Sequence, residues 1–300
     1  MDYEVKIIDL EAPGVGDQVA SLINTTFNHN LTWQEIKLNT YYDNSIAGSP
    51  PSFYVGAFDR DKLIGFTAYK SHDFLYNGEV VNCFHHCVVC TSNEYRGKGI
   101  FPKILEFGKA EILRLGGGFV YGIPNHNSGP VFKKLNYKFF GPFQKVNVFN
   151  IPFLFESAFK PWTENDILYS SDSYFQNDFQ LIDSKRKEEG DAIIVVEDFG
   201  NVLWGKVLHK KMGPVRVSYF SVGGMIVNKP HFFKQTVKKL FKKHSVQFVQ
   251  FIFHNTSIFK NLFNKPVDAA FVEPFVVYDL KAKLPEKASF NFMPGIKNNF

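Results

Sequence analysis

The chain has 300 residues, of which 45% are apolar and 21% charged, the proportions of a soluble globular protein with one large or two ordinary domains. The net charge of +5 fits a small anionic ligand but is too diffuse to indicate a nucleic-acid-binding protein. No apolar run approaches membrane-spanning length, and the N-terminus lacks the basic-then-apolar pattern of a signal peptide. We therefore expect a cytoplasmic protein with no nucleic-acid partner and no membrane partner.

The first part of the chain alternates between strand and helix patterns. A strand pattern at 3–10 precedes apolar residues at helical spacing, which predict one helix over 18–42. Two strands, 53–59 and 63–70, form a hairpin with a turn between them, and a further strand covers 80–91.

The period of the apolar residues changes from strand to helix at Phe101 and continues to Leu115. Pro102 fits the first helical turn, where no N–H is required, and three consecutive glycines from Gly116 end the helix. The remaining elements predicted in this half are a strand at 119–124, a short helix at 127–135, and one or two strands over 138–149.

The second half of the chain repeats this plan. Residues 53–70 align with 193–210 without a gap, so that Gly65 meets Gly205, and the segment from Phe119 aligns with the one from Phe248. We therefore predict two copies of one α/β module, at 1–150 and 180–300, joined by a polar linker at 151–179.

The stretch "RGKG", Arg96–Gly99, lies between a strand pattern and a helix pattern and has no counterpart in the second half. Free N–H groups at the start of a helix favour negative charge, and glycines let the backbone approach phosphate oxygens. Arg96 and Lys98 add charge-assisted contacts. The spacing is not that of a Walker loop. The stretch predicts a phosphate-binding loop in the first module alone.

This loop and a segment after it resemble two motifs of the GNAT N-acetyltransferase superfamily. In the pattern Gln/Arg-x-x-Gly-x-Gly/Ala, the chain has Arg96 and Gly99, with Phe101 in place of the small residue. The pattern Asn-x-x-Ala-x-x-Leu-Tyr-x-Lys-Leu-Gly-Phe is similar to "NHNSGPVFKKLNY", which begins at Asn125 and has Phe132 in place of the tyrosine. The resemblance covers residues 3–149 and, more faintly, the rest.

The resemblance implies an α/β (α+β) fold of two GNAT-like modules, each a mixed, mainly antiparallel sheet flanked by helices. It implies acetyl-CoA, or another acyl-CoA, as co-substrate. The CoA-binding residues that it implies are Cys87 and Val89 for the pantetheine arm, Arg96, Gly97, Lys98, Gly99 and Ile100 for the pyrophosphate, and Asn125 and Ser128 in the second motif.

The acid and base usual in this family are missing, because Phe132 replaces the tyrosine and Cys83 stands where a carboxylate is common. A CoA thiolate can leave without a strong acid. His85 lies on the same strand face as Cys83 and suits a general base, because histidine titrates near neutral pH. Tyr121 on the adjacent strand and a water relay remain alternatives, and His85 could instead be a structural histidine.

Two further motifs have simpler interpretations. Cys83, Cys87 and Cys90 have the spacing of an iron–sulfur motif, but a strand would place Cys83 and Cys87 on one face and Cys90 on the other. We therefore expect buried thiols and no metal. The basic amphipathic segment Lys234–His244 is interpreted as the solvated face of a packed helix rather than a membrane-binding or RNA-binding element.

The predicted function is that of a GNAT-type N-acyltransferase that moves an acetyl group from acetyl-CoA to a small-molecule amine. An amino sugar is one candidate acceptor, from a resemblance to GNAT proteins of surface-polysaccharide pathways. One alternative is a CoA-binding sensor or scaffold without turnover. Another is an aminoacyl or long-acyl transferase of tandem GNAT type.

Overall fold

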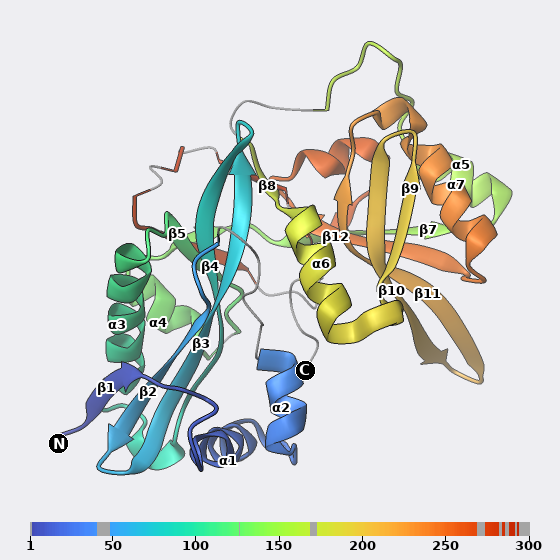
Figure 1. The fold of residues 1–300 in the computed structure, drawn as a ribbon. Helices are drawn as coiled ribbons and strands as arrows, with labels where there is room; N and C mark the ends of the chain where they lie inside the picture. The colour runs from blue at the N-terminus through green and yellow to red at the C-terminus, as the bar shows by residue number, and fades with distance from the viewer. Residues whose placement is uncertain are drawn as a thin grey trace.

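The computed structural model describes residues 2–40, 49–125, 127–168, 173–268, 274–281, 284–285, 288–291 and 293. Two mixed, mainly antiparallel sheets with flanking helices lie side by side (Figure 1), which confirms the predicted fold class. None of the helices in the described part of the chain is long and apolar enough to cross a membrane.

The first sheet is built mostly from the first half of the chain. Its leading strands pair antiparallel in the order β1 (Glu4–Ile7), β2 (Phe53–Asp59), β3 (Lys62–Tyr76) and β4 (Glu79–Thr91). β5 (Phe119–Gly122) then pairs parallel with β4. Helix α1 (Val15–Phe27) packs on one face of this sheet, and α3 (Ile100–Arg114) packs on the other.

The predicted helix over 18–42 is wrong in one respect, because the chain forms two helices there. α1 ends at Asn28, whose φ of 57° is left-handed and whose N–H donates to the carbonyl of Asn24. A second helix, α2 (Trp33–Thr40), follows after a short turn. The last two residues of the predicted helix, 41 and 42, lie outside the described residues.

The second sheet repeats the element order of the first. β9 (Ile194–Asp198), β10 (Asn201–Met212) and β11 (Val215–Ile226) pair antiparallel, and β12 (Phe248–His254) pairs parallel with β11. Helix α7 (Phe233–Lys243) connects β11 to β12 as α3 connects β4 to β5. Its apolar stripe, Phe233, Val237, Leu240 and Phe241, is buried in the core, as predicted for a packed helix.

One strand from each half completes the sheet of the other half. β7 (Phe143–Phe149) pairs with β12 and β13 (Val267–Asp268) of the second sheet. β14 (Phe275–Asp279) pairs with β5 and β6 (Lys138–Phe140) of the first. β14 lies between β5 and β6, and β7 lies between β12 and β13, which are the corresponding strands of the second sheet. The green strand β7 can be followed from the first half into the second sheet in Figure 1.

The segment predicted as a linker, residues 151–179, is partly structured. It contains α5 (Pro152–Ala158) and β8 (Ser173–Gln176), and β8 pairs with the end of β3 and with β15 (Ser289–Asn291). The shorter helical elements are α4 (Gly129–Lys134), η1 (Asn93–Tyr95), η2 (Gly190–Ala192), η3 (Pro230–Phe232) and η4 (Ile258–Leu262).

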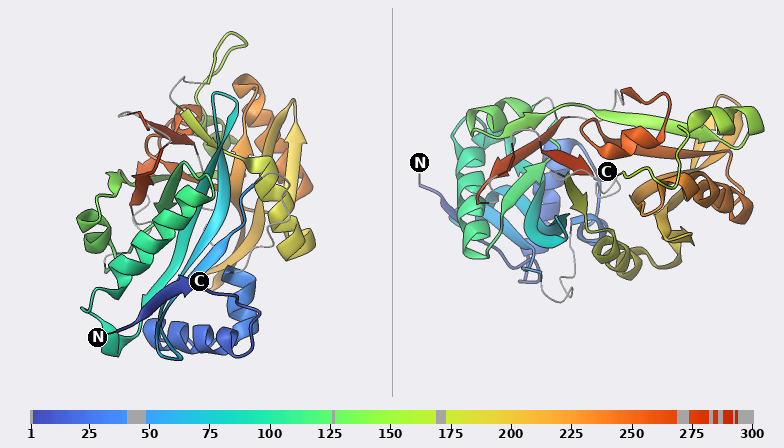
Figure 2. Two further views of the ribbon diagram at one scale, coloured as in Figure 1. Left: turned by 60° about the vertical axis from the view of Figure 1, so that its left-hand side comes forward. Right: turned by 90° about the horizontal axis from the view of Figure 1, so that it is seen from above.

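Helix α6 (Asp178–Glu189) lies between the two sheets (Figures 1 and 2). Its Leu181 and Ile182 belong to one apolar cluster with Phe74 and Tyr121 of the first sheet and Trp204 of the second. Because this cluster contains residues of both sheets, α6 brings side chains from the second half onto a face of the first sheet.

Candidate active site

The predicted phosphate loop, Arg96–Gly99, connects the end of η1 to the first residue of α3. Gly97 and Gly99 both have φ of 76°, a left-handed conformation that glycine adopts without strain. A Cβ atom at either position would have no other atom within 4 Å, so the space above both glycines is open. The loop itself is exposed, while Ile100 is buried and anchors the start of the helix.

Tyr95, the residue just before the loop, contacts both the β2–β3 hairpin and the loop. The hydroxyl of Tyr95 donates to Asp59 Oδ2 at 2.7 Å, which fixes the ring against the β2–β3 hairpin. The ammonium group of Lys98 lies 4.7 Å from the centre of this ring. This contact holds the Lys98 side chain over the Tyr95 ring, and Arg96 is exposed.

Strand β4 carries an irregularity just before the loop. Val88 has a φ of 53°, and the β3–β4 register shifts there, since Ala68 opposes Cys87 while Phe66 opposes Cys90. Pairing of β4 with β5 covers only Cys83–His85 opposite Phe119–Tyr121. Beyond that point the backbone around Cys87 and Val89 has no pairing with β5, and the two strands separate.

The extra residue at this bulge corrects the predicted orientation of the cysteines. Cys83, Cys87 and Cys90 oppose His72, Ala68 and Phe66, which are even-numbered residues of β3 and share one face. All three cysteines therefore lie on that face, whereas the unbroken alternation had placed Cys90 on the other. No three metal-ligating side chains gather in the described residues. Burial raises the pKa of all three thiols, that of Cys90 to about 12.

The two predicted catalytic residues, His85 and Tyr121, come together where β4 and β5 separate. They are in direct register, and their rings are stacked with centroids 4.9 Å apart. His85 is 6% exposed and Tyr121 is 1% exposed. Burial raises the pKa of the Tyr121 hydroxyl well above its ordinary value, so the phenol stays protonated and is suited to donate a hydrogen bond.

Two polar residues of β3 that the sequence analysis did not single out lie on the same face. Lys70 directly opposes His85, and it is buried. The ring of His72 is 6.1 Å from that of His85 and 6.5 Å from that of Tyr121. Burial, assisted by the charges of Lys70 and Lys185, lowers the pKa of His72 to about 3, so His72 is neutral. The signal was present, because Lys70 and His72 interrupt an otherwise apolar strand face.

Lys185 reaches this site from α6, in the other half of the chain. It follows the core residue Leu181 by one helical turn, and it is buried. Its positive charge contributes to the lowered pKa of His72 and opposes the rise that burial causes in the pKa of Cys87. No local sequence pattern could have identified Lys185, because its proximity depends on how α6 packs between the sheets.

His86 follows His85 directly on β4 and lies on the opposite face of the sheet. Its ring packs edge-on against Phe132 at 4.6 Å and stacks on Tyr137 at 5.9 Å. Burial lowers the pKa of His86 to about 3. Phe132, which replaces the tyrosine of the family motif, is 1% exposed and belongs to this apolar core.

The second motif forms the turn that leads into α4. Asn125 Oδ1 accepts hydrogen bonds from the backbone N–H groups of Asn127 at 3.0 Å and Ser128 at 3.1 Å. The hydroxyl of Ser128 lies 3.2 Å from the same oxygen. These contacts give Asn125 a structural role in shaping the turn.

Comparisons with known proteins agree with this geometry. Residues 14–140 match the family described as an acetyltransferase (GNAT) domain. A GCN5-related N-acetyltransferase from Kribbella flavida is 11% identical, with 93% of this chain and 72% of that chain covered and a TM-score of 0.62. Eis1 from Mycobacterium abscessus is 10% identical, with 93% of this chain and 73% of that chain covered and a TM-score of 0.60. A search of curated proteins finds no match.

A putative acetyltransferase from Pyrococcus horikoshii shares the fold over nearly its whole length. It is 10% identical, with 98% of this chain and 95% of that chain covered and a TM-score of 0.56. At these identities the structural likeness concerns the fold alone. The matched domain, however, includes the loop Arg96–Gly99 and the strands that carry His85 and Tyr121. Residues 14–140 therefore match the GNAT acetyltransferase domain, and the fold of the chain is similar to that of GNAT proteins.

Proposed function

We propose that the protein transfers an acetyl group from acetyl-CoA to the amino group of a small molecule. The observation that carries this proposal is the arrangement along β4. The open glycine loop at Gly97 and Gly99 lies at one end of the strand, and the His85–Tyr121 pair lies upstream, where β4 and β5 part. In this proposal the reaction site lies on β4, and the phosphate site lies on the loop that follows β4 and η1.

The loop suits the CoA pyrophosphate. The first N–H groups of α3 point toward the loop, and the helix dipole favours negative charge there. Arg96 would pair with a phosphate oxygen, and Lys98 would do the same after leaving the Tyr95 ring. The backbone at Cys87 and Val89, which β5 does not pair, would hold the amides of the pantetheine arm.

The reaction joins the acceptor nitrogen to the thioester carbon and breaks the carbon–sulfur bond, so that the CoA thiolate leaves. The ammonium proton of the acceptor must be removed, and we assign this to His85. Tyr121 stays protonated, so we assign it the role of hydrogen-bond donor to the oxyanion or the thiolate rather than that of base.

The acceptor would enter from the face that carries Lys70, His72 and Lys185. Helix α6 covers that face and belongs to the second half, which lacks a phosphate loop. We therefore assign acyl-CoA binding to the first half and part of the acceptor site to α6 of the second.

Release of the CoA thiol tests the proposal. The full chain is mixed with acetyl-CoA and a panel of amines that includes amino sugars, amino acids and polyamines, and CoA binding is measured in parallel by calorimetry. Turnover with a small amine supports the proposal. Binding without turnover would instead favour the CoA sensor, for which the burial of Phe132 in place of a tyrosine is the motive. Turnover with long-chain acyl-CoA alone would favour the long-acyl transferase.

A further inference from the structure

The positive charge of this chain is concentrated in one segment. Residues 199–267 contain twelve lysines and arginines and no aspartate or glutamate, whereas the whole chain has 34 basic and 29 acidic residues. The rest of the chain is therefore acidic, with 22 basic residues against 29 acidic ones. The small net charge of the whole chain is thus the sum of a strongly basic segment, which contains most of the second sheet and α7, and an acidic remainder.

Part of this charge is neutralised by acidic residues outside the segment. On α7, Lys234 and Lys238 pair with Glu156, and Lys239 pairs with Asp198 at 3.0 Å. The helix end and the tip of the β10–β11 hairpin carry other cations that make no ion pair within the described part of the chain. These are Lys242 and Lys243 on α7 and Lys210, Lys211 and Arg216 on the hairpin, all of them exposed.

Exposed apolar side chains lie next to these cations. Ile151, just before α5, is 52% exposed, and Phe153 and Leu154, in the first turn of α5, are 80% and 42% exposed. At the hairpin tip Val215 is 58% exposed. Side chains of this size are rarely left in water as a group without a partner.

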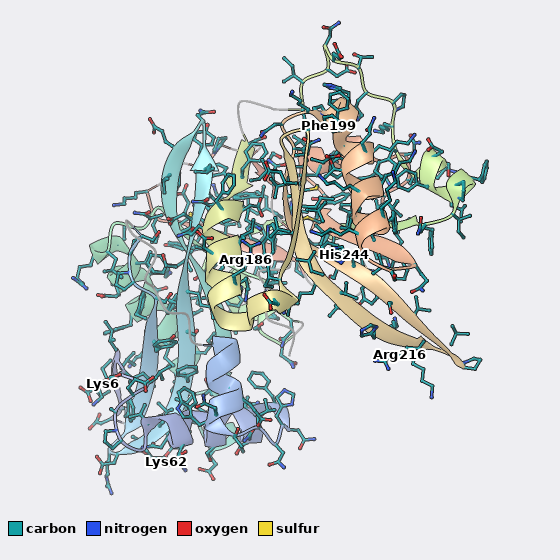
Figure 3. All side chains as sticks on the ribbon, turned by 45° about the vertical axis from the view of Figure 1, so that its right-hand side comes forward. Lys6, Lys62, Arg186, Phe199, Arg216 and His244 are labelled. Atoms are coloured by element: carbon teal, nitrogen blue, oxygen red, sulfur yellow. The ribbon has the colours of Figure 1, made fainter. Side chains whose placement is uncertain are left out.

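A chain of hydrogen bonds joins the three elements into one surface. The N–H of Asn150 donates to the carbonyl of Gln247 at 2.9 Å. The N–H of Gln247 donates to the carbonyl of Ser218 at 2.9 Å, and Ser218 Oγ is 2.8 Å from His209 Nδ1. The start of α5, the end of α7 and the base of the hairpin thus lie at the end of the second sheet that faces away from the first, and the hairpin tip projects beyond them (Figures 1 and 2). Figure 3 shows Arg216 at the hairpin tip and His244 at the end of α7.

We propose that this surface, hereafter the basic–apolar surface, docks the protein on a membrane of anionic lipid. Lysine and arginine side chains are attracted to anionic headgroups, and exposed apolar side chains enter the boundary between headgroups and acyl chains. The presence of both cations and exposed apolar side chains favours a lipid membrane over a nucleic acid. A nucleic acid would use the cations and could stack on Phe153, but it would leave Ile151, Leu154 and Val215 in water.

The helix α7 does not itself insert, because its apolar stripe is already buried in the protein core. The contact is therefore peripheral, made by side chains that protrude from a folded surface. It departs from our expectation of no membrane partner, which rested on net charge and the lack of a spanning segment. It is independent of the reaction proposed above.

The test is flotation of the full chain with vesicles of phosphatidylglycerol and phosphatidylcholine in equal parts, beside vesicles of phosphatidylcholine alone. We expect binding to the anionic vesicles only, and release when salt rises from about 0.05 M to about 0.5 M. The double variant Lys242→Gln/Lys243→Gln should bind roughly tenfold or more weakly. Phe153→Ser should bind several-fold more weakly, with an unchanged melting curve because the residue is exposed.

The matched control is Lys138→Gln/Lys281→Gln, which removes the same charge from exposed positions associated with the first sheet. It should bind as tightly as the unmodified chain. Equal weakening in this control would overturn the proposal, since net charge alone would then explain binding. Unchanged binding of Phe153→Ser would overturn it too, because a purely electrostatic partner needs no apolar side chain. So would an absence of vesicle binding at low salt, or a preference for a short RNA or DNA in competition.

Discussion

The imidazole of His85 and the phenol of Tyr121 are stacked across two parallel strands, with ring centroids 4.9 Å apart and planes 12° apart. They are the last pair of residues that hold β4 and β5 together. Because β4 and β5 are not paired beyond this position, the two side chains lie where the two strands begin to separate.

Replacing His85 by glutamine tests its role as base. We expect kcat to fall roughly 100-fold, because general-base catalysis contributes about that much, while CoA affinity stays the same. The rate of the unmodified protein should fall at acidic pH, since a protonated imidazole cannot accept a proton, and this fall should vanish in the variant. His29→Gln, at an exposed position, is the control. A His85 variant whose only defect is a lower melting temperature would show a structural histidine instead.

Replacing Gly99 by valine tests the phosphate loop. Valine at a left-handed φ is strained by about 1–2 kcal/mol, and its side chain would fill the open space above the loop. We expect CoA binding to be lost in calorimetry. Gly78→Val is the matched control, because Gly78 has a φ of 81° and equally open space but lies in the β3–β4 turn. If both variants lose stability alike and both still bind CoA, the loop is not the phosphate site.

Asp178 predicts a dependence of stability on pH. It is buried between the halves and accepts hydrogen bonds from Trp204 Nε1 at 2.6 Å and Gln176 Nε2 at 2.8 Å. Burial nevertheless raises the pKa of this carboxyl from 3.8 to about 7. The folded state therefore binds the proton more tightly than the unfolded state, so the contribution is fully favourable below pH 3.8 and is lost as pH rises to about 7.

Asp178→Asn removes this titration and keeps an oxygen that can accept a hydrogen bond. Between pH 4 and pH 8 the stability of the unmodified chain, relative to the variant, should fall by on the order of 3–4 kcal/mol. Urea unfolding of both proteins across this range measures the difference. The buried histidines His72, His86 and His254 act in the opposite direction, since their lowered pKa values make the folded state lose stability as pH falls. They are common to both proteins and cancel. A flat difference between the two curves would contradict the prediction.

The strand exchange predicts that the first half does not fold alone. A fragment of residues 1–150 lacks β14, which fills the gap between β5 and β6, and it exposes β7 without its partners. We expect no cooperative unfolding transition and no CoA binding from this fragment. Adding a fragment of residues 151–300 should restore both. Cooperative unfolding of the first fragment by itself would show that β14 is dispensable.

The sequence by itself determined the local features. The hairpin of β2 and β3, the glycine loop, the helix α3 and the face of His85 follow from patterns a few residues long. Alternation, helical spacing and the freedom of glycine are properties of neighbouring residues and need no knowledge of the fold. The internal repeat likewise indicated the shared element order, since both copies keep the spacing of their hairpins.

The tertiary structure decided which segments meet. One inserted residue at Val88 turned Cys90 to the face of Cys83, because a strand's alternation reverses at a bulge. β7 and β14 exchanged sheets, and the charge of Lys185 acts on His72 from the other half, because strand pairing and helix packing bring together residues that no local pattern connects. The basic–apolar surface depends on the same cause: its cations and its apolar side chains come from three separate segments that only the packing of the second sheet brings together.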